Sequence, residues 1–318
     1  MLVIFMSKPL DYISILGPTA AGKTAVAIEL AKHFPIEVVS VDSVSVYQGL
    51  DIGSAKPSND EMRDVRHHLI DCVTLDEIYT VGRFVDDANR LIKEIRSRGK
   101  IPLFCGGTMM YMKALQSGYA DLPVIPDEVI GEVNRLLEEK GVEALYLNLK
   151  QQDPEMAKRI KPGDQQRLVR ALSVKLHTGR SLSDYWNQAE PSFKHMDILL
   201  MCNDRIKHRD RLADRFDMML KQGFIDECYR LHKTYGADIW NHPALRSIGY
   251  KEIGMHIRKS LPISDVRELA IISSSQYVKR QMTWLNAWYT LCSAKIELYP
   301  EIKDINKLAI SLVESVIG

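Results

Sequence analysis

The sequence predicts an α/β protein, in which a parallel sheet flanked by helices forms a core and a helical domain is inserted into that core. Short apolar runs alternate with helical patterns over the first 120 residues, as in parallel sheets covered by helices. Between about residues 127 and 190 helical patterns dominate, after which a strand-like run returns. With 318 residues, of which 46% are hydrophobic and 26% charged, the chain is long enough for two folded units.

Strand and helix signals follow one another in the expected core. Residues 12–16 and 36–41 are apolar runs of strand length, and residues 101–105 are a third. A helical pattern follows the first run, and residues 80–98 carry apolar side chains at helical spacing up to Gly99, where this helix should end. Because strands and helices alternate, we expect the strands to lie parallel in one sheet.

The expected insertion begins at a boundary rich in proline and ends where strand patterning resumes. Residues 121–200 are assigned to the helical insertion, and residues 1–120 together with 201–318 to a catalytic core. Residues 196–202 restore a strand-like run, and long helices follow, including one over residues 264–290. The sequence thus predicts two units, of which the second interrupts the first.

Composition excludes several classes of protein. No apolar run approaches the ~18 residues that span a bilayer, and the apolar stretch of residues 1–6 is shorter than the core of a signal peptide. The five cysteines are odd in number and scattered without a C-x-x-C pair, which argues against disulfides and zinc and fits a reducing compartment. We therefore expect a cytoplasmic protein without membrane attachment.

The net charge of +1 conceals two basic segments. Residues 158–180 carry seven Lys or Arg against one acid, and residues 246–280 carry seven against three. Basic segments in a near-neutral protein indicate a polyanion-binding surface. Solvated helix faces are the alternative, and composition alone leaves both interpretations open.

The segment GPTAAGKT matches the phosphate-binding pattern G-x-x-x-x-G-K-[ST] and lies between an expected strand and an expected helix. Its glycines let successive N–H groups turn inward, the helix N-terminus adds a positive dipole end, and Lys23 adds a full charge. The hydroxyl of Thr24 is placed to bind a magnesium ion that bridges phosphate oxygens. The sequence therefore predicts a P-loop that holds a di- or triphosphate, formed by Gly17, Pro18, Thr19, Ala20, Ala21, Gly22, Lys23 and Thr24.

Asp42 directly follows the expected strand of residues 36–41. An aspartate in this place is typical of the magnesium ligand of P-loop NTPases, but the long polar loop DSVSVYQGLDIGSAKP that it opens indicates a pocket for a second substrate. A guanine-binding N-K-x-D motif is absent from the sequence, which argues against a GTPase. A magnesium ligand and a proton acceptor both remain open for Asp42.

Seven segments in the same order resemble the bacterial type of the tRNA dimethylallyltransferase (isopentenyltransferase) family. The resemblance implies transfer of a dimethylallyl group from dimethylallyl diphosphate to the exocyclic N6 amine of the adenosine 3′-adjacent to the tRNA anticodon, with the P-loop holding the donor's diphosphate. We expect Mg²⁺ as cofactor and a monomer that binds the anticodon stem-loop of tRNA. The segments span roughly residues 11–290 and are GPTAAGKT (17–24), DSVSVYQGLDIGSAKP (42–57), HHLID (67–71), CGGTMMYMKAL (105–115), QQRLVRAL (165–172), ALRSIGYKEI (244–253) and YVKRQMTWL (277–285).

Elementary chemistry and the resemblance together suggest a role for single residues. An adenine amine is a weak nucleophile, so Asp42 is the expected acceptor of its proton, and Lys23 helps to hold the departing diphosphate. By resemblance, Arg215 faces the diphosphate, Thr19 lies by the donor, and Thr108 contacts the accepting nucleotide. The resemblance places tRNA contacts at Asp42, Ser43, Val44, Ser45, Thr108, Gln166, Arg167, Leu168, Val169, Arg170, Arg246, Ser247, Ile248, Gly249, Tyr250, Lys251, Lys279, Arg280, Gln281, Met282, Thr283, Trp284, Leu285 and Asn286.

Other interpretations stay open at several positions. Arg215 alternates with acidic residues, as a solvated helix charge would, and Thr108 follows a Gly-Gly turn, as a helix N-cap would. Ser45 stands where many members of the family have Gln, a departure from the family's pattern. An aromatic stripe over residues 277–288 is interpreted as core packing.

Two other functions fit parts of the sequence. A small-molecule or nucleotide kinase would use the basic insertion as a lid over the phosphates, and a non-catalytic RNA-binding module would use the basic segments alone. Under the prenyltransferase interpretation, the insertion is instead a clamp that closes over the tRNA loop. The P-loop beside Asp42 argues against the module, while the kinase is opposed mainly by the family resemblance.

Overall fold

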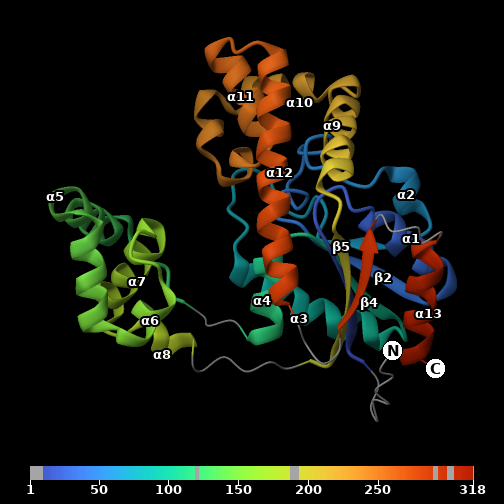
Figure 1. The fold of residues 1–318 in the computed structure, drawn as a ribbon, viewed down its shortest axis with the longest axis horizontal. Coiled ribbons are helices and arrows are strands. Elements are labelled where there is room, and N and C mark those ends of the chain that lie inside the picture. Colours follow the sequence, from blue (N-terminus) through green and yellow to red (C-terminus); the bar gives the residue numbers. More distant parts are fainter. Residues whose placement is uncertain (1–9, 119–121, 187–192, 289–292, 299–303, 318) are drawn as a thin grey trace. The chain divides into compact units, whose positions relative to one another are not determined.

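The structure of the chain is a computed structural model (Figure 1) that describes residues 10–118, 122–186, 193–288, 293–298 and 304–317. The chain divides into two compact units, one formed by residues 1–113 with 193–318 and the other by residues 114–192. The insertion expected at residues 121–200 therefore differs at both ends. Its second boundary lies too late because residues 195–199 are paired with the first strand of the sheet.

Within the described residues, the first unit contains a six-stranded parallel sheet of order β3-β2-β4-β1-β5-β6. Its strands are β1 (Tyr12–Leu16), β2 (Ile36–Val41), β3 (His67–His68), β4 (Ile101–Gly106), β5 (His195–Cys202) and β6 (Ser293–Leu298). The predicted strands correspond to β1, β2, β4 and β5, and the predicted α/β class is confirmed. Because parallel strands end at the same edge, the loops after β1, β2 and β4 are brought together there.

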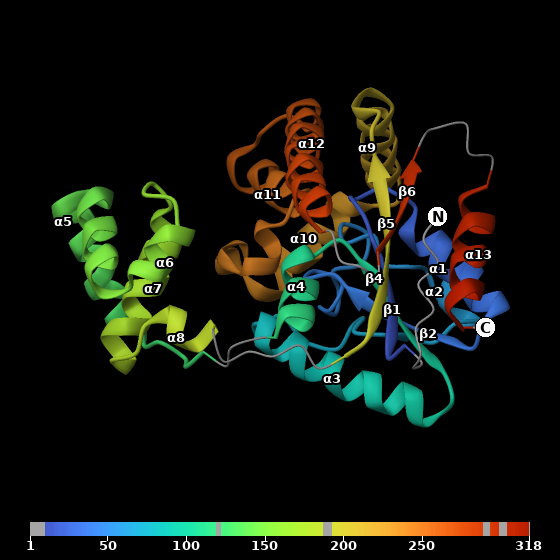
Figure 2. The same ribbon diagram turned by 60° about the horizontal axis from the view of Figure 1, so that its bottom comes forward.

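One face of the sheet is covered by α1 (Lys23–His33) and α13 (Ile305–Ile317), as Figure 2 shows. Every second residue of a strand points to this face. Ile13 and Ile15 of β1 accordingly pack in one apolar core with Leu30 of α1. Burying one such side chain contributes roughly 1.5–3 kcal/mol, so this core holds α1, and with it the start of the P-loop helix, against the sheet.

The opposite face carries α3 (Val81–Ser97) and α4 (Met109–Ser117). The ring of Phe104, on β4, meets Phe84 of α3 edge to face with 6.4 Å between centroids. Phe84 in turn stacks on Tyr111 of α4 at 4.5 Å. The amphipathic helix expected between the second and third predicted strands is thereby confirmed as α3.

A group of helices follows β5 in the first unit. The long helix α12 (Ile263–Ala287) packs against α9 (Arg205–Lys221) and α11 (Tyr250–Lys259). Arg267 of α12 and Asp217 of α9 form a two-pronged ion pair, with N–O distances of 2.6 and 2.7 Å. The long helix expected in this part of the sequence is confirmed. The remaining elements of this unit are α2 (Asn59–Arg63), α10 (Phe224–Tyr235) and the short 3₁₀ helices η1 (Ala237–Asn241) and η2 (Pro243–Arg246).

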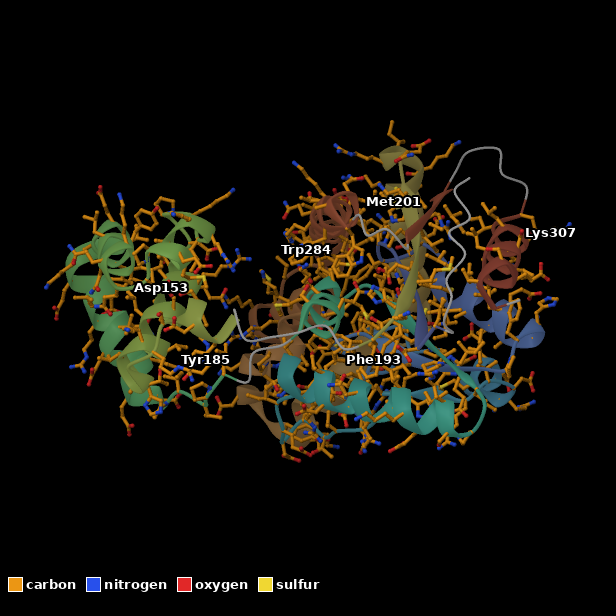
Figure 3. All side chains as sticks on the ribbon, turned by 90° about the horizontal axis from the view of Figure 1, so that it is seen from below. Asp153, Tyr185, Phe193, Met201, Trp284 and Lys307 are labelled. Atoms are coloured by element: carbon orange, nitrogen blue, oxygen red, sulfur yellow. The ribbon has the colours of Figure 1, made fainter. Side chains whose placement is uncertain are left out.

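The second unit consists of helices around an apolar core of its own. They are α5 (Asp127–Gln152), α6 (Pro154–Arg159), α7 (Gln165–Thr178) and α8 (Leu182–Trp186). The kink in α5 lies at Gly141, whose φ of 77° suits glycine. The buried carboxylate of Asp153 (Figure 3) accepts hydrogen bonds from the N–H of Met156 and from both the N–H and the hydroxyl of Ser183. Among the helices described in either unit, none is long and apolar enough to cross a membrane.

Candidate active site

The loops after β1, β2 and β4 meet at the carboxyl edge of the sheet, and the turn after β4 is hydrogen-bonded to the end of β2. The carbonyl of Val41, the last residue of β2, accepts the N–H groups of Gly107 and Thr108 at 3.2 Å each. A Cβ atom on Gly106 would lie 2.1 Å from that carbonyl oxygen, so only glycine fits there. The turn after β4 is therefore fixed beside Asp42, the residue that follows β2.

The P-loop has the strand–loop–helix arrangement that the sequence predicted. Gly22 adopts a left-handed conformation (φ 82°) as the N-cap of α1, and Lys23 is the first residue of the helix. The ammonium of Lys23 donates hydrogen bonds to the carbonyls of Gly17 at 3.0 Å and Pro18 at 2.7 Å. Burial lowers the pKa of Lys23 to about 8; Arg215 acts in the same direction, whereas Cys105 and Asp42 oppose the shift. A buried cation at a helix N-terminus is well suited to hold an anion.

Gln281 of α12 ties the P-loop to the turn after β4. Its Oε1 accepts the N–H of Thr19 at 3.0 Å, and its Nε2 donates to the carbonyl of Gly107 at 2.9 Å. His208 of α9 contacts the same loop from another side, with Nε2 2.9 Å from the carbonyl oxygen of Thr19. Burial lowers the pKa of His208, which favours a neutral ring that donates this bond. Two helices thus hold the P-loop in place through side chains.

A cleft of about 470 Å³ opens at this edge, lined by the predicted site residues Thr19, Asp42, Thr108 and Arg215 and by seven further positions predicted for tRNA contact. Burial lowers the pKa of Arg215, and Asp42 opposes that shift, so Arg215 is a cleft residue rather than a solvated helix charge. Leu212, Phe216 and Met219 of α9 form an apolar side of the cleft. Sequence reasoning did not identify them, although they recur at helical spacing. The other residues of the lining are Ser43, Val44, Tyr47, Gly53, Ser54, Tyr79, Pro243, Ala244, Arg246, Ser247, Ile248, Gly249, Ser274, Tyr277 and Arg280.

Asp42 is held by its own loop. Its Oδ1 accepts the N–H groups of Val44 at 2.8 Å and Ser45 at 3.1 Å, a local turn typical of aspartate. The side chain of Ser45 is buried and lies 3.0 Å from the hydroxyl of Ser40. Ser45 therefore supports the loop, and its side chain is not available to a ligand.

Two groups stand out among the positions that the resemblance assigned to tRNA contact. The polar side chains Gln166, Arg167, Arg170, Arg246, Lys251, Lys279, Arg280, Thr283 and Asn286 are exposed. Ser45, Leu168, Tyr250, Gln281 and Leu285 are buried. A buried side chain that packs against protein cannot also contact a nucleic acid, so for the second group we retain only a supporting role.

The aromatic residues of α12 do not form one class, although the sequence suggested core packing for all of them. Trp288 is buried and donates its indole N–H to the carboxylate of Asp197 at 2.9 Å. Tyr277 lines the cleft, and burial raises its pKa to about 12. The ring of Trp284 (Figure 3) is 39% exposed. Core packing therefore holds for Trp288 and is wrong for the other two.

The comparison with family models identifies the chain. The model described as IPP transferase matches residues 45–288. The chain belongs to this family. The relationship covers most of the sequence: the tRNA dimethylallyltransferase of Nitrosomonas eutropha is 38% identical over 309 residues, which are 96% of this chain and 94% of that protein. The tRNA dimethylallyltransferase of Neisseria gonorrhoeae is 42% identical over 275 residues, 86% of this chain and 88% of that one.

Solved structures of IPP transferases show the same fold. The full-length tRNA isopentenylpyrophosphate transferase from Bacillus halodurans matches with a TM-score of 0.68 and 31% identity, covering 96% of each chain. A eukaryotic dimethylallyltransferase acting on tRNA matches with a TM-score of 0.75 and 27% identity, covering 90% of this chain and 73% of that one. The resemblance inferred from the seven sequence segments is therefore confirmed.

The start of α1 offers an oxygen ligand of the kind that Mg²⁺ prefers. Among the residues that the structure describes, no group of three or more His, Cys, Asp or Glu could hold a metal ion by itself. Mg²⁺ prefers oxygen ligands and often relies on substrate phosphates and water for most of them. The Thr24 hydroxyl, in the first turn of α1, would supply one such oxygen, and an ion here would depend on a bound diphosphate for its other ligands.

Inorganic pyrophosphate should bind this IPP transferase more weakly as the pH rises through about 8. The ammonium of Lys23, whose pKa burial lowers to about 8, carries its positive charge only below that pH, so its attraction to an anion is lost above it. Pyrophosphate itself becomes more negative over this range, which alone would strengthen binding. Calorimetric titration from about pH 7 to about pH 9 measures the affinity.

The Lys23→Arg variant is the control for this pH dependence, because arginine keeps its charge throughout the range. The affinity of the variant should not fall as the pH rises. If both proteins give the same pH dependence, Lys23 does not carry the effect.

Proposed function

We propose that this chain transfers the dimethylallyl group of dimethylallyl diphosphate to the exocyclic N6 amine of the adenosine 3′-adjacent to the anticodon of tRNA, and releases diphosphate. The observation that carries the proposal is the single cleft shared by Thr19 of the P-loop, Asp42, Thr108 and Arg215. The names of the relatives favour prenyl transfer over the kinase that a P-loop alone permits. The protein is expected to act as a monomer in the cytoplasm.

Asp42 serves as the proton acceptor in this reaction. The lone pair of the adenine amine is delocalised into the ring, so attack on the allylic carbon is helped by removal of an amine proton. The N6–C1 bond forms while the C1–O bond of the donor breaks, and its electron pair leaves with the diphosphate. The displaced amine proton passes to the carboxylate of Asp42, which two backbone N–H groups keep in position.

The departing diphosphate is held by positive groups. Lys23 lies at the N-terminus of α1, and Arg215 lines the cleft that Thr19 of the P-loop also lines. Fixed charges and N–H groups that face a developing negative charge usually supply the largest share of catalysis. A bound Mg²⁺ would add Lewis-acid stabilisation of the same oxygens, with Thr24 as its protein ligand.

The accepting adenosine lies in a stacked loop and has to be turned out to reach the cleft, at a cost of roughly a few kcal/mol. Contacts with the tRNA backbone have to offset this cost, and such contacts weaken as salt rises. Arg246 and Arg280 are exposed at the cleft, and Arg167 and Arg170 are exposed on α7 of the second unit. We assign phosphate contacts to these four residues, which makes the second unit a clamp for the stem-loop.

Replacing Gly107 by alanine should lower the rate of prenyl transfer roughly 10- to 100-fold, because small displacements of a reacting group slow a reaction strongly. Its Cβ atom would lie 2.5 Å from Nε2 of Gln281 and 3.2 Å from the carbonyl oxygen of Gly17. Gln281 would have to move, and the tie between the P-loop and the turn that carries Thr108 would be lost. Steady-state rates with a labelled donor measure the effect.

Gly131→Ala is the matched control, since a Cβ atom at this position of α5 meets nothing within 4 Å. Its activity should equal that of the unchanged protein. A Gly107→Ala protein with normal rates would show that the tie through Gln281 is not needed.

The proposal is tested by incubating the protein with Mg²⁺, dimethylallyl diphosphate labelled in the prenyl group, and an RNA stem-loop with adenosine 3′ of its anticodon. Label should enter the RNA, and digestion should locate it on N6 of that adenosine. Replacing this adenosine by guanosine should prevent incorporation. Transfer of label from ATP to a small molecule or to RNA, without any prenyl transfer, would instead support the kinase.

A further inference from the structure

Glu227, on α10, is a buried carboxylate outside the residues that line the cleft; its exposed fraction is 2%. Its Oε2 accepts the N–H groups of Asp51 at 3.1 Å and Ile52 at 2.7 Å. Its Oε1 accepts the N–H of Gly53 at 3.3 Å and the hydroxyl of Tyr250 at 2.6 Å. Four neutral donors therefore converge on one carboxylate, two on each oxygen, and they come from two different segments of the chain.

Both segments belong to the wall of the cleft. Gly53 and Ser54 line it from the loop after β2, and Gly249, directly before Tyr250, lines it from the turn after η2. The ring of Phe224, one turn before Glu227 on α10, packs against both glycines. A Cβ atom on Gly53 would lie 2.2 Å from this ring, and one on Gly249 would lie 2.9 Å from it. Phe224 and Glu227, on one face of α10, thus hold the two segments in place, one through its ring and the other through its carboxylate.

We infer that Glu227 is a positioning residue for the nucleotide that accepts the prenyl group. It acts through the two wall segments and does not touch the reacting atoms. The segment that leads to Tyr250 follows Arg246 and Ser247, which also line the cleft. By contrast, the side chains of Gln281 and His208 hold the P-loop, through bonds to Thr19 and Gly107. Glu227 should therefore affect the acceptor and leave diphosphate binding unchanged. This inference rests on the proposed function.

The Glu227→Gln variant tests this role. Glutamine keeps the shape of the side chain but replaces one oxygen by an NH₂ group, which would face two donors of the wall segments. The KM for the RNA stem-loop should rise roughly 10- to 100-fold, while kcat and the affinity for inorganic pyrophosphate stay close to those of the unchanged protein. A purely structural role would lower the fraction of active protein, and so kcat, without changing KM.

Two further variants complete the test. Tyr250→Phe removes one of the four donors and should raise the KM for RNA by less than Glu227→Gln does; it also carries the test if Glu227→Gln does not fold. Asp226→Asn removes an exposed carboxylate from the adjacent position of α10, and its KM should be unchanged.

An unchanged KM in Glu227→Gln and Tyr250→Phe, or a loss confined to kcat and thermal stability, would overturn the inference. So would a parallel loss of pyrophosphate affinity. If the unchanged protein transfers no prenyl group to the stem-loop, the proposed function itself fails, which is a different outcome from normal transfer by both variants.

Discussion

Replacing Asp42 by asparagine should lower prenyl transfer roughly 10²- to 10⁴-fold, the range for losing a general base. Asparagine keeps an oxygen that can accept the N–H groups of Val44 and Ser45, which Oδ1 of Asp42 accepts at 2.8 and 3.1 Å. The loop should therefore keep its shape while the side chain can no longer take up a proton. Single-turnover rates with labelled dimethylallyl diphosphate and a saturating stem-loop measure the effect.

The same variant separates the two roles left open for Asp42. If Asp42 accepts the proton, the variant should keep its affinity for pyrophosphate in the presence of Mg²⁺. If Asp42 is a magnesium ligand, this affinity should fall together with the transfer rate. Asp60→Asn, which changes an exposed carboxylate on α2, is the control and should keep full activity. Transfer by Asp42→Asn within about threefold of normal would contradict a general-base role.

Replacing Lys23 by methionine should cost roughly 10²- to 10³-fold in transfer, as expected when one preorganised group facing the departing charge is lost. Binding of pyrophosphate should weaken as well. The folded protein should not lose stability, because burial lowers the pKa of Lys23 to about 8 and therefore disfavours its charged form. Thermal unfolding and steady-state rates, measured on the same preparation, test both halves of this prediction.

Lys32→Met on the same helix is the control for Lys23→Met. Lys32 forms an exposed ion pair with Glu29 at 2.9 Å, a contact of about 0–1 kcal/mol. Its removal should leave transfer unchanged. Normal pyrophosphate affinity in Lys23→Met would contradict the assignment of the P-loop as the diphosphate site.

Much of the core could be predicted because its signals are local. The strand of residues 36–41 is an apolar run bounded by a proline and an aspartate, and the P-loop is one contiguous motif. By contrast, β3 has two residues and no periodicity to detect. The insertion boundary at residue 200 divided β5, although the apolar run of residues 196–202 indicates a strand there and residues 195–199 pair with β1.

The candidate site was predicted in part. Asp42, Thr108 and Arg215 come together as expected, because the ends of parallel strands meet and the resemblance supplied the rest. The role of Gln281 could not be predicted, since Thr19, its partner, lies 262 residues away in the chain. Glu227 looks like an ordinary helix acid in the sequence, and its four donors are evident only from the fold.

The most direct test of the account is a crystal structure of the protein with Mg²⁺, a non-hydrolysable analogue of dimethylallyl diphosphate and the RNA stem-loop. The account predicts that the diphosphate lies on the N–H groups of the P-loop beside Lys23. It also predicts that the adenosine next to the anticodon is turned out of the loop, with N6 within hydrogen-bond distance of Asp42. Adenine and ribose of a nucleotide occupying the cleft beyond the P-loop, with the RNA bound elsewhere, would contradict it.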